Sequence, residues 1–483
     1  MIISISINNY AIFAGKEDFS LIADARNKSF PCNVFFGNGF NVVKTAGLFG
    51  GNNSGKTCFV RAVRCIRDVL LGKVDGADIT PYCFGDSKIC SLGVSFLYDG
   101  KAYRYEFKYD ASTDPVRKGF LFERFQELNK DKYGNKKANE IFLRDLHNPQ
   151  RPRCRVSVDK SDEGHCNDMA FAYAIERVPR DRILIYSDEI LEIPVLRKAK
   201  AILISFANNI DVISMKDIPL DKTVRVLKNE DPIKTRVVSF IKASDIGIDD
   251  CFYMEPDDVC QSSDRRDIQY QMSPGEWRHP QGTVMIYPVT GMDSQYDAIK
   301  NHEDQYNLIS VHNGHPVRSR LFDSEGSLKL IALASYIIDA VDNGKVLVVD
   351  ELDSSLHYKL TRSILSFFNL DSNVNGQLIF TAQDAMQLNI QRLFRKDQIW
   401  FTVNHADYED EDNENNTTVR DEDIVRLYSL NMFTAQNDGI RSDSYLLDRY
   451  STGKLGSIPR PNYTDLIIES LERKRRRGNE QEN

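Results

Sequence analysis

The sequence predicts an α/β fold with a parallel β-sheet at its core. Three observations lead to this prediction. Short apolar runs alternate with segments of helical periodicity, a glycine-rich turn separates one such strand from the helix after it, and another apolar strand ends in two acidic residues. Because parallel strands are buried and joined by helices, this order indicates a parallel sheet.

Composition indicates a globular protein. The chain has 483 residues, of which 41% are hydrophobic and 10% aromatic, so it can form two or three domains with a sizeable core. Its formal net charge is -8. An acidic chain is not expected to coat nucleic acid along its whole surface, although a local basic patch is compatible with this charge.

Neither the cysteines nor the apolar stretches predict a disulfide framework, a zinc site, a secretory signal or a membrane segment. The nine cysteines are scattered without C-x-x-C spacing, so neither a disulfide framework nor a zinc site is predicted. The opening MIISISINNY is too short and too polar for a secretory signal, and no run of 18 apolar residues occurs. We therefore expect a soluble, cytoplasmic protein without membrane contact.

Several elements of the first half can be predicted. Ile3, Ile5 and Ile7 alternate with polar residues, which is typical of a half-buried strand. Alternating apolar residues on both sides of Asp99-Gly100 predict a hairpin. The polar residues 126–168 are expected to form loop and surface helix. Residues 185–245 are expected to be helical, without the sustained heptads of a coiled coil.

The second half continues the strand and helix alternation. A helix over residues 328–341 is expected to stop at Asn343-Gly344. Apolar strands are expected at residues 346–349 and 377–381, with a second helix between them.

The glycine-rich turn at residues 50–57 fits the pattern G-x-x-x-x-G-K-[ST] at every position. Glycines let the backbone curl so that its N–H groups face phosphates, and the following helix adds its positive N-terminal end. Lys56 is expected to reach the β- and γ-phosphates, and the Thr57 hydroxyl to hold Mg²⁺. The candidate nucleotide-binding residues of this P-loop are Gly50, Asn52, Asn53, Ser54, Gly55, Lys56 and Thr57.

Two carboxylates end the strand at residues 346–349. Asp350 is placed to bind Mg²⁺ through water, and Glu351 to position and polarise an attacking water. Upstream, Ser324 and Gly326 stand just before the helix expected from Leu328. Serine and glycine at a helix N-terminus form a second anion site, although the same residues also serve as an ordinary helix cap.

This order of motifs resembles the ATPase heads of the ABC, SMC and RecF-like proteins. The resemblance implies an ABC-type ATPase head, with a mixed sheet carrying the P-loop, an N-terminal antiparallel β part and a mainly helical insertion. In that family the serine–glycine signature of one protomer caps the ATP bound by another. Ser324 and Gly326 are thus expected to complete composite sites in a homo-oligomer, at least a dimer, with ATP and Mg²⁺ as cofactors.

Two positions depart from the common pattern of the family. His357, a candidate nucleotide-binding residue, occupies the D-loop position at which transporters carry aspartate. Gln383, a candidate catalytic residue, stands where the family has its switch histidine. Because glutamine can donate a hydrogen bond to a γ-phosphate but cannot take up a proton, slow hydrolysis is a hypothesis for this chain.

The resemblance also divides the chain into four parts. Residues 1–125 are expected to form the N-terminal lobe with the P-loop, and 126–300 a largely helical insertion. Residues 301–405 are expected to form the C-terminal lobe with the signature, Walker B and switch segments, and 406–483 a C-terminal extension.

A narrower resemblance is to the ATPases of bacterial abortive-infection operons, such as the AbiLi-like and RloA-like proteins and the AriA subunit of PARIS. It is carried by residues 350–357, 398–401, 449–450 and 456–459, and by Asn8-Asn9-Tyr10. In that group the ATPase senses infection or cages a partner, and a separate toxin does the damage. The implied partners are a TOPRIM-type or RloB-like nuclease and a phage trigger, either protein or nucleic acid.

Two other functions stay open at this point. An OLD-type nuclease would carry a TOPRIM domain after the ATPase head, but the acids at residues 409–412 and 421–423 do not follow apolar strands. A RecF- or SMC-like DNA-repair ATPase is the other alternative. The acidic charge and the missing coiled coil count against it.

Overall fold

The computed structural model of the chain describes residues 1–37, 39–115, 117–130, 136–147, 153–156, 174–187, 193–229, 231–254, 259–261, 284–286, 307–383, 393–404 and 425–432. Most of the expected insertion after residue 254 lies outside these ranges. The same holds for the expected extension from residue 406, apart from residues 425–432.

The centre of the molecule is a six-stranded sheet in the order β11-β17-β18-β5-β19-β20. The first five strands are parallel, and β20 pairs antiparallel with β19 at the edge. In this order the strands are β11 (Ile210–Ser214), β17 (Val346–Asp350), β18 (Gln377–Ala382), β5 (Thr45–Phe49), β19 (Ile399–Asn404) and β20 (Val425–Ser429). Because parallel strands end at the same edge of a sheet, the residues that follow β5, β11, β17 and β18 are brought together.

A second sheet is antiparallel and has the order β10-β9-β8-β7-β6-β1-β2. Its strands are β1 (Ile2–Tyr10), β2 (Phe13–Ser20), β6 (Ile89–Tyr98), β7 (Lys101–Asp110), β8 (Gly119–Lys130), β9 (Lys136–Asp145) and β10 (Arg153–Val156). The hairpin predicted at Asp99-Gly100 joins β6 to β7, and both turn residues have positive φ. The predicted α/β fold, with a largely parallel central sheet and an antiparallel β part near the N-terminus, is therefore confirmed.

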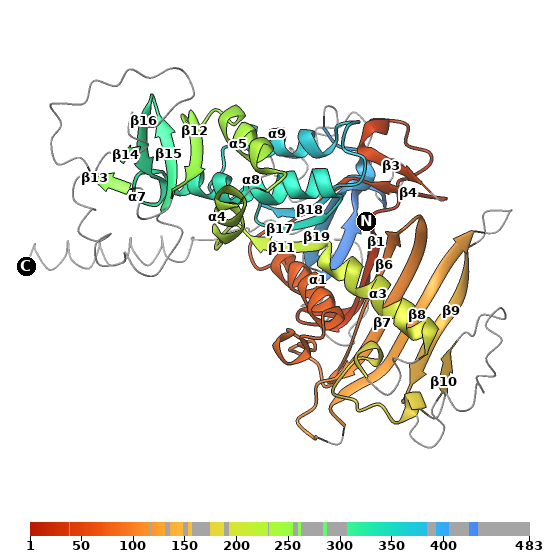
Figure 1. Cartoon of the computed structure of the whole chain (residues 1–483). Coiled ribbons are helices and arrows are strands. Elements are labelled where there is room, and N and C mark those ends of the chain that lie inside the picture. The colour runs from red at the N-terminus through yellow and green to blue at the C-terminus, as the bar shows by residue number, and fades with distance from the viewer. Residues whose placement is uncertain are drawn as a thin grey trace, which may run out of the picture.

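Smaller sheets flank these two. β12 (Asp250–Tyr253), β15 (Leu308–His312) and β16 (His315–Arg318) form three strands, which lie far from the seven-stranded sheet (Figure 1). The two remaining pairs are β13 (Val259–Gln261) with β14 (Val284–Ile286), and β3 (Val34–Gly37) with β4 (Phe40–Val43).

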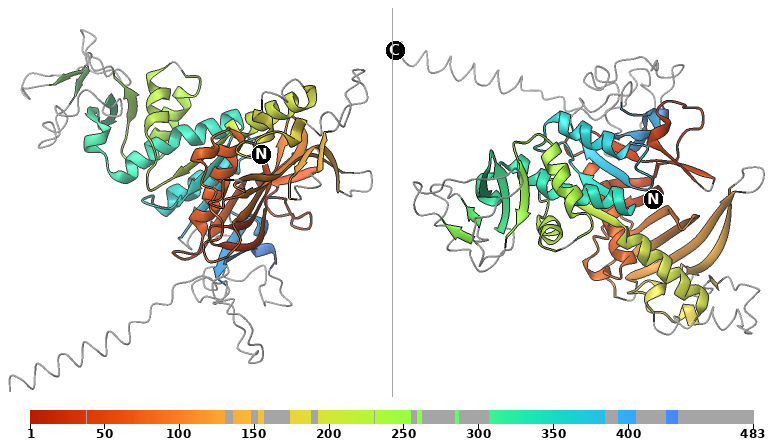
Figure 2. Two further views of the ribbon diagram at one scale, coloured as in Figure 1. Left: turned by 90° about the horizontal axis from the view of Figure 1, so that it is seen from below. Right: turned by 45° about the horizontal axis from the view of Figure 1, so that its top comes forward.

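Helices cover both faces of the central sheet. They are α1 (Lys56–Leu70), α3 (Pro194–Asn208), α4 (Asp221–Lys228), α5 (Lys234–Ala243), α7 (Ser319–Phe322), α8 (Glu325–Asn343) and α9 (Tyr358–Phe368). α1 contacts β11 and β17 on one side, while α8 and α9 contact β17 and β18 (Figures 1 and 2). The side chains of β17 alternate between two cores: Val346 and Val348 belong to the first, Leu347 and Val349 to the second. The predicted helix ends as expected at Gly344, whose φ is 68°.

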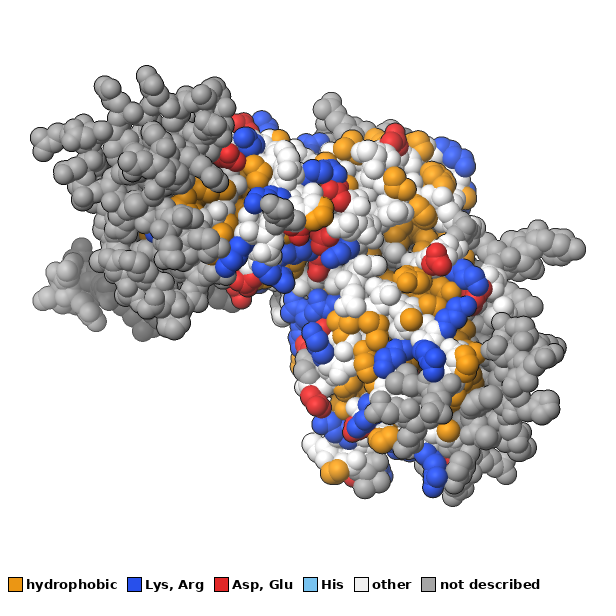
Figure 3. Space-filling model, in the orientation of Figure 1, with side chains coloured by type: hydrophobic (Ala, Val, Ile, Leu, Met, Phe, Trp, Pro, Cys, Tyr) orange, Lys and Arg blue, Asp and Glu red, His pale blue; other side chains and the backbone are white. Residues whose placement is uncertain are grey.

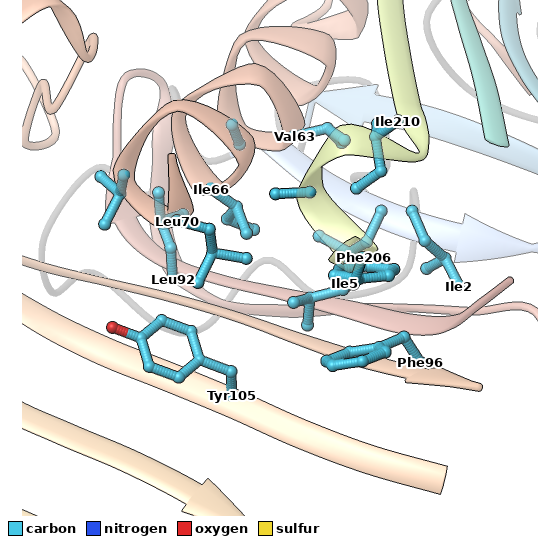
Figure 4. Packing of buried hydrophobic residues seen from close by; sticks show 14 of the residues in the cluster. Ile2, Ile5, Val63, Ile66, Leu70, Leu92, Phe96, Tyr105, Phe206 and Ile210 are labelled. Carbon is cyan, nitrogen blue, oxygen red and sulfur yellow. The ribbon is translucent and has the colours of Figure 1, made fainter. Parts of the chain in front are cut away.

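The antiparallel sheet shares a core with the central one. Figure 4 shows apolar side chains of β1 and β6 facing those of α1 and α3. Phe96 of β6 stacks on Phe206 of α3 with ring centroids 3.8 Å apart. Phe19 of β2 lies 4.7 Å from both Phe59 of α1 and Trp400 of β19. Such aromatic pairs contribute about 0.5–1.5 kcal/mol each beyond the area they bury, so they hold the two sheets firmly together.

The expectation of loop and surface helix over residues 126–168 is wrong for the part that the structure describes. Residues 126–130 continue β8, and β9 and β10 follow, so the boundary expected after residue 125 falls within a strand. The sequence does not show the apolar alternation of a strand here, because charged residues occupy buried positions of β8 and β9. Glu123 of β8 and Arg144 of β9 are both 0% exposed and form an ion pair. Glu123 also accepts from the Tyr105 hydroxyl at 3.1 Å and the Leu184 N–H at 3.0 Å. Satisfied in this way, a buried carboxylate is tolerated where an apolar residue is expected.

The helical prediction for residues 185–245 is only partly confirmed. Helices α3, α4 and α5 lie there, but β11 stands between α3 and α4. Apolar residues recur from α3 into β11, and periodicity alone does not separate a short buried strand from a helix.

Within the described ranges, no helix is both long and apolar enough to span a bilayer. On the face shown in Figure 3, Lys and Arg side chains are interspersed with acidic and hydrophobic ones.

Candidate functional site

The glycine-rich loop connects β5 to α1 at the carboxyl edge of the central sheet. Every residue of β5 is buried, and α1 begins at Lys56. Gly55 has a φ of 96°, and a Cβ there would lie 2.5 Å from Ile12 Cδ1. A Cβ at Gly50 would lie 2.1 Å from Thr402 Oγ1. Both positions therefore require glycine, and the loop leaves its backbone N–H groups at the positive end of a 15-residue helix.

Lys56 is a buried cation bonded to neutral groups. It is 5% exposed, and its Nζ donates to the carbonyls of Gly50 at 2.7 Å and Gly51 at 2.5 Å. Burial lowers the pKa of this ammonium, while the carboxylates of Glu351 and Asp350 act in the opposite direction. Because carbonyl partners do not cancel its charge, Lys56 is suited to attract an anion.

The rest of the loop is held by hydroxyl contacts and by one left-handed residue. Ser54 Oγ lies 2.6 Å from Thr402 Oγ1 and donates to the Gly51 carbonyl at 2.8 Å, which links the loop to β19. Asn53 has a φ of 60°, a conformation that asparagine tolerates better than most residues. Asn52 and Asn53 are exposed at the tip of the loop.

A chain of hydrogen bonds joins α1, β17 and β18 around Asp350. The Thr57 hydroxyl donates to Asp350 Oδ2 at 2.9 Å. The Thr381 hydroxyl donates to Asp350 Oδ1 at 2.7 Å and accepts from the Glu351 N–H at 2.8 Å. Both carboxylate oxygens of Asp350 are thus oriented, and the residue is 3% exposed.

The Thr57 and Asp350 oxygens fit a magnesium ion bound together with a nucleotide. Mg²⁺ prefers oxygen ligands and is usually held by one or two protein groups, with phosphates and waters completing its shell. Among the described residues there is no cluster of three or more His, Cys, Asp or Glu that could hold a metal. This donor set fits an ion that arrives with phosphates better than one held by protein ligands alone.

Glu351 stands in a strained turn directly after β17. Its φ is 56°, and it is 9% exposed. Its Oε1 accepts from Gln383 Nε2 at 3.2 Å and lies 2.9 Å from Lys216 Nζ, and this contact raises the pKa of Lys216. The Gln383 backbone N–H is in turn held by Asp353 Oδ2 at 2.8 Å. A non-glycine residue in the left-handed region costs about 1–3 kcal/mol, and such strain clusters at functional sites.

The two signature residues make local contacts. Ser324 is the N-cap of α8, where its Oγ accepts from the Ser327 N–H at 3.2 Å. A Cβ at Gly326 would lie 2.7 Å from the Ser355 carbonyl oxygen, so this glycine is needed for close packing on the turn after β17. Among the described residues, no hydrogen bond joins Ser324 to the P-loop.

His357 also serves as a helix cap. It is the N-cap of α9, and its Nδ1 accepts from the Lys359 N–H at 3.4 Å. The structure thus brings together five of the predicted residues: Lys56, Thr57, Asp350, Glu351 and Gln383. Ser324 and Gly326 lie apart from them at the N-terminus of α8, and His357 lies at the N-terminus of α9.

Three residues that the sequence analysis did not single out belong to this cluster. Thr381 orients Asp350 and Glu351, Thr402 holds the P-loop serine, and Lys216 contacts Glu351. Thr381 and Thr402 could have been found as polar residues within otherwise apolar strands. Lys216 gives no such signal, because the sequence predicts a helix where β11 precedes it.

Comparison with known proteins identifies one family and two similar solved structures. The sequence model of a family described as "AAA domain, putative AbiEii toxin, Type IV TA system" matches residues 46–385. No curated protein matches the chain. Among solved structures, the SMC head domain from Thermotoga maritima is similar with a TM-score of 0.36 and 10% identity, covering 89% of this chain and 98% of that one. An SMC head bound to the C-terminal winged-helix domain of ScpA has a TM-score of 0.38 and 10% identity, covering 89% and 97%.

Proposed function

The chain belongs to this family of AAA-domain proteins, whose model covers residues 46–385, and from this we propose that it binds and hydrolyses MgATP at the P-loop. The single observation that supports the proposal most is the contact between Thr57 and Asp350, 2.9 Å apart, with Glu351 next in the chain. A hydroxyl at the start of the P-loop helix and a carboxylate at the end of another strand of the same sheet are the two groups that hold Mg²⁺ in P-loop NTPases.

Each residue of the cluster then has a distinct task. Lys56 and the N–H groups at the start of α1 bind the β- and γ-phosphates. Thr57 and Asp350 hold Mg²⁺, which neutralises charge on the phosphates. Glu351 orients the attacking water, and Gln383 keeps the Glu351 carboxylate in place. From the neighbouring strand, Thr381 holds the Asp350 carboxylate and the Glu351 backbone N–H.

We further propose that the site is completed by a second copy of the chain. Ser324 and Gly326 lie at the N-terminus of the 19-residue helix α8, which is positive and partly exposed. Their serine–glycine pattern resembles the signature that caps a nucleotide held by another protomer. ATP would then join two protomers in a closed dimer, and hydrolysis would release them. His357 would lie near the same interface.

The biological role that we propose is that of an ATPase sensor or scaffold in bacterial anti-phage defence. The family description names the AbiEii toxin and a type IV toxin–antitoxin system, which supports a partnership with a toxin. The partner would be a separate effector, a TOPRIM-type or RloB-like nuclease, released or activated when a phage component is detected.

The test uses two variants with opposite effects on nucleotide. Lys56→Ala is expected to lose ATP binding, whereas Glu351→Gln is expected to bind ATP and hydrolyse it slowly. Both should lose phage protection in cells that carry the complete operon. Full protection by both variants would contradict an ATP-driven function.

A second measurement addresses the partner. A toxin encoded next to this gene should co-purify with the wild-type protein, and the amount bound should depend on nucleotide. If the purified ATPase instead binds DNA in a salt-dependent manner without any protein partner, the DNA-repair alternative is favoured.

A further inference from the structure

Lys216 lies at the carboxyl edge of the central sheet because it follows β11. Ser214, the last residue of β11, pairs with Asp350, and the Met215 N–H donates to the Asp350 carbonyl at 3.0 Å. A turn closed by the Asp217 N–H and the Ser214 carbonyl, 3.2 Å apart, then folds the chain back at Lys216. The backbone thus places this lysine beside the end of β17.

The side chain of Lys216 is positioned to change partners. Its Nζ lies 2.9 Å from Glu351 Oε1, yet its side chain is 67% exposed while that of Glu351 is 11% exposed. An ion pair with one exposed partner contributes only about 0–1 kcal/mol, so little free energy is lost when it opens. The four-carbon stem of lysine is flexible and can carry the ammonium to a stronger anion nearby.

The charged groups around Glu351 indicate which anion could attract the Lys216 ammonium. Among the described residues, the ammonium groups of Lys56 and Lys216 both interact with the carboxylates of Asp350 and Glu351. Lys56 is bonded to the carbonyls of the P-loop, where the phosphates of a nucleotide enter. A terminal phosphate carries more charge than one carboxylate and forms stronger charge-assisted hydrogen bonds.

We propose that Lys216 is a second ammonium that binds the terminal phosphate of a nucleoside triphosphate and so makes the site prefer triphosphate over diphosphate. This inference rests on the proposed MgATP site. With a diphosphate bound, Lys216 stays on Glu351 and shares Oε1 with Gln383. With a triphosphate bound, Lys216 moves to the phosphate and leaves the Glu351 carboxylate free for water. Lys216 is thus a binding residue for the nucleotide and a positioning residue for Glu351.

The test compares the affinity for two nucleotides by calorimetry, using ADP and the non-hydrolysable analogue AMPPNP with Mg²⁺. For Lys216→Met we expect AMPPNP to bind about tenfold more weakly, because one charge-assisted hydrogen bond is lost, while ADP affinity stays unchanged or rises. Lys216→Arg should keep most of the preference for AMPPNP. Lys101→Met is a matched control, because Lys101 is a 54% exposed lysine paired with Glu127 on the antiparallel sheet. It should change neither affinity.

The outcomes separate this inference from the function on which it rests. If Lys216→Met leaves the ratio of the two affinities unchanged while Lys56→Ala abolishes binding of both nucleotides, the role of Lys216 is overturned and the MgATP site stands. If the wild-type protein binds neither nucleotide, both the site and the role of Lys216 are wrong.

Discussion

The two halves of the proposed composite site are built in different ways. The half that contains Lys56, Thr57, Asp350 and Glu351 is joined by side-chain hydrogen bonds between α1 and the central strands, and three of these four residues are buried. The half that contains Ser324 is a helix end whose hydroxyl contacts the next turn of the same helix. The first half is therefore held in place by contacts within one protomer. The second half is held by helix-cap contacts and remains partly exposed.

This difference means that a substitution of a polar residue has different consequences in the two halves. A polar residue buried among strands needs its partners for stability, so its loss affects both fold and chemistry. A polar residue at an exposed helix end can be replaced by another capping residue without loss of the helix. Substitutions that preserve the cap but change its charge therefore test the signature half alone.

The largest effect is expected for Glu351→Gln. Loss of the group that polarises water should lower the rate of hydrolysis by about 10²–10⁴-fold, the usual contribution of a general base. ATP binding should persist, because Thr57 and Asp350 are unchanged. Single-turnover hydrolysis and equilibrium binding of ATP measure the two properties separately. A variant with unchanged rate would remove Glu351 from the mechanism.

A smaller effect, confined to the signature half, is expected for Ser324→Asp. Aspartate caps a helix as well as serine does, so the midpoint of urea unfolding should stay the same or rise. Its charge would repel a phosphate, and like charges placed together cost several kcal/mol, so steady-state hydrolysis should fall on the order of 100-fold. Ser324→Asn is the uncharged control. Equal rates for the aspartate and asparagine variants would mean that no phosphate approaches α8.

Thr381→Val tests the buried half through stability. The change leaves Asp350 Oδ1 and the Glu351 N–H without their partner, so the free energy of unfolding should fall by about 1–3 kcal/mol. Thr361→Val is the matched control, because Thr361 is also buried but its hydroxyl has no hydrogen-bond partner among the described residues. Urea denaturation should show the control to be neutral or stabilised. Equal destabilisation of both variants would indicate a packing effect only.

The smallest effect is expected for Gln383→His. Histidine can take up a proton and glutamine cannot, so the variant should hydrolyse ATP a few-fold faster if Gln383 limits the rate. The present contact with Glu351 Oε1 is within reach of a histidine ring nitrogen. An unchanged single-turnover rate would count against the hypothesis that Gln383 keeps hydrolysis slow.

Much of this architecture follows from local sequence patterns. The P-loop, the strand that ends at Asp350 and the helix capped by Ser324 were each predicted from short patterns with a direct physical cause. Apolar periodicity did not predict strands whose buried positions are occupied by charged residues that pair with another strand. Arg144 occupies a buried strand position only because Glu123 faces it from β8, and periodicity does not reveal a partner on another strand.

The same limit applies to the candidate site. Thr381, Thr402 and Lys216 act through residues distant in sequence, which only the order of the parallel strands brings together. Local patterns therefore identified the groups proposed to touch nucleotide, but not those that position them.

The most direct test of the account is to mix two inactive variants, Lys56→Ala and Ser324→Asp. The first lacks a working P-loop and the second a working signature, so each alone should be nearly inactive. If ATP is bound between two protomers, a mixed dimer contains one intact site, and random pairing of an equal mixture should restore about one quarter of the wild-type rate. Activity of the mixture no greater than the sum of the separate variants would contradict a site shared between protomers.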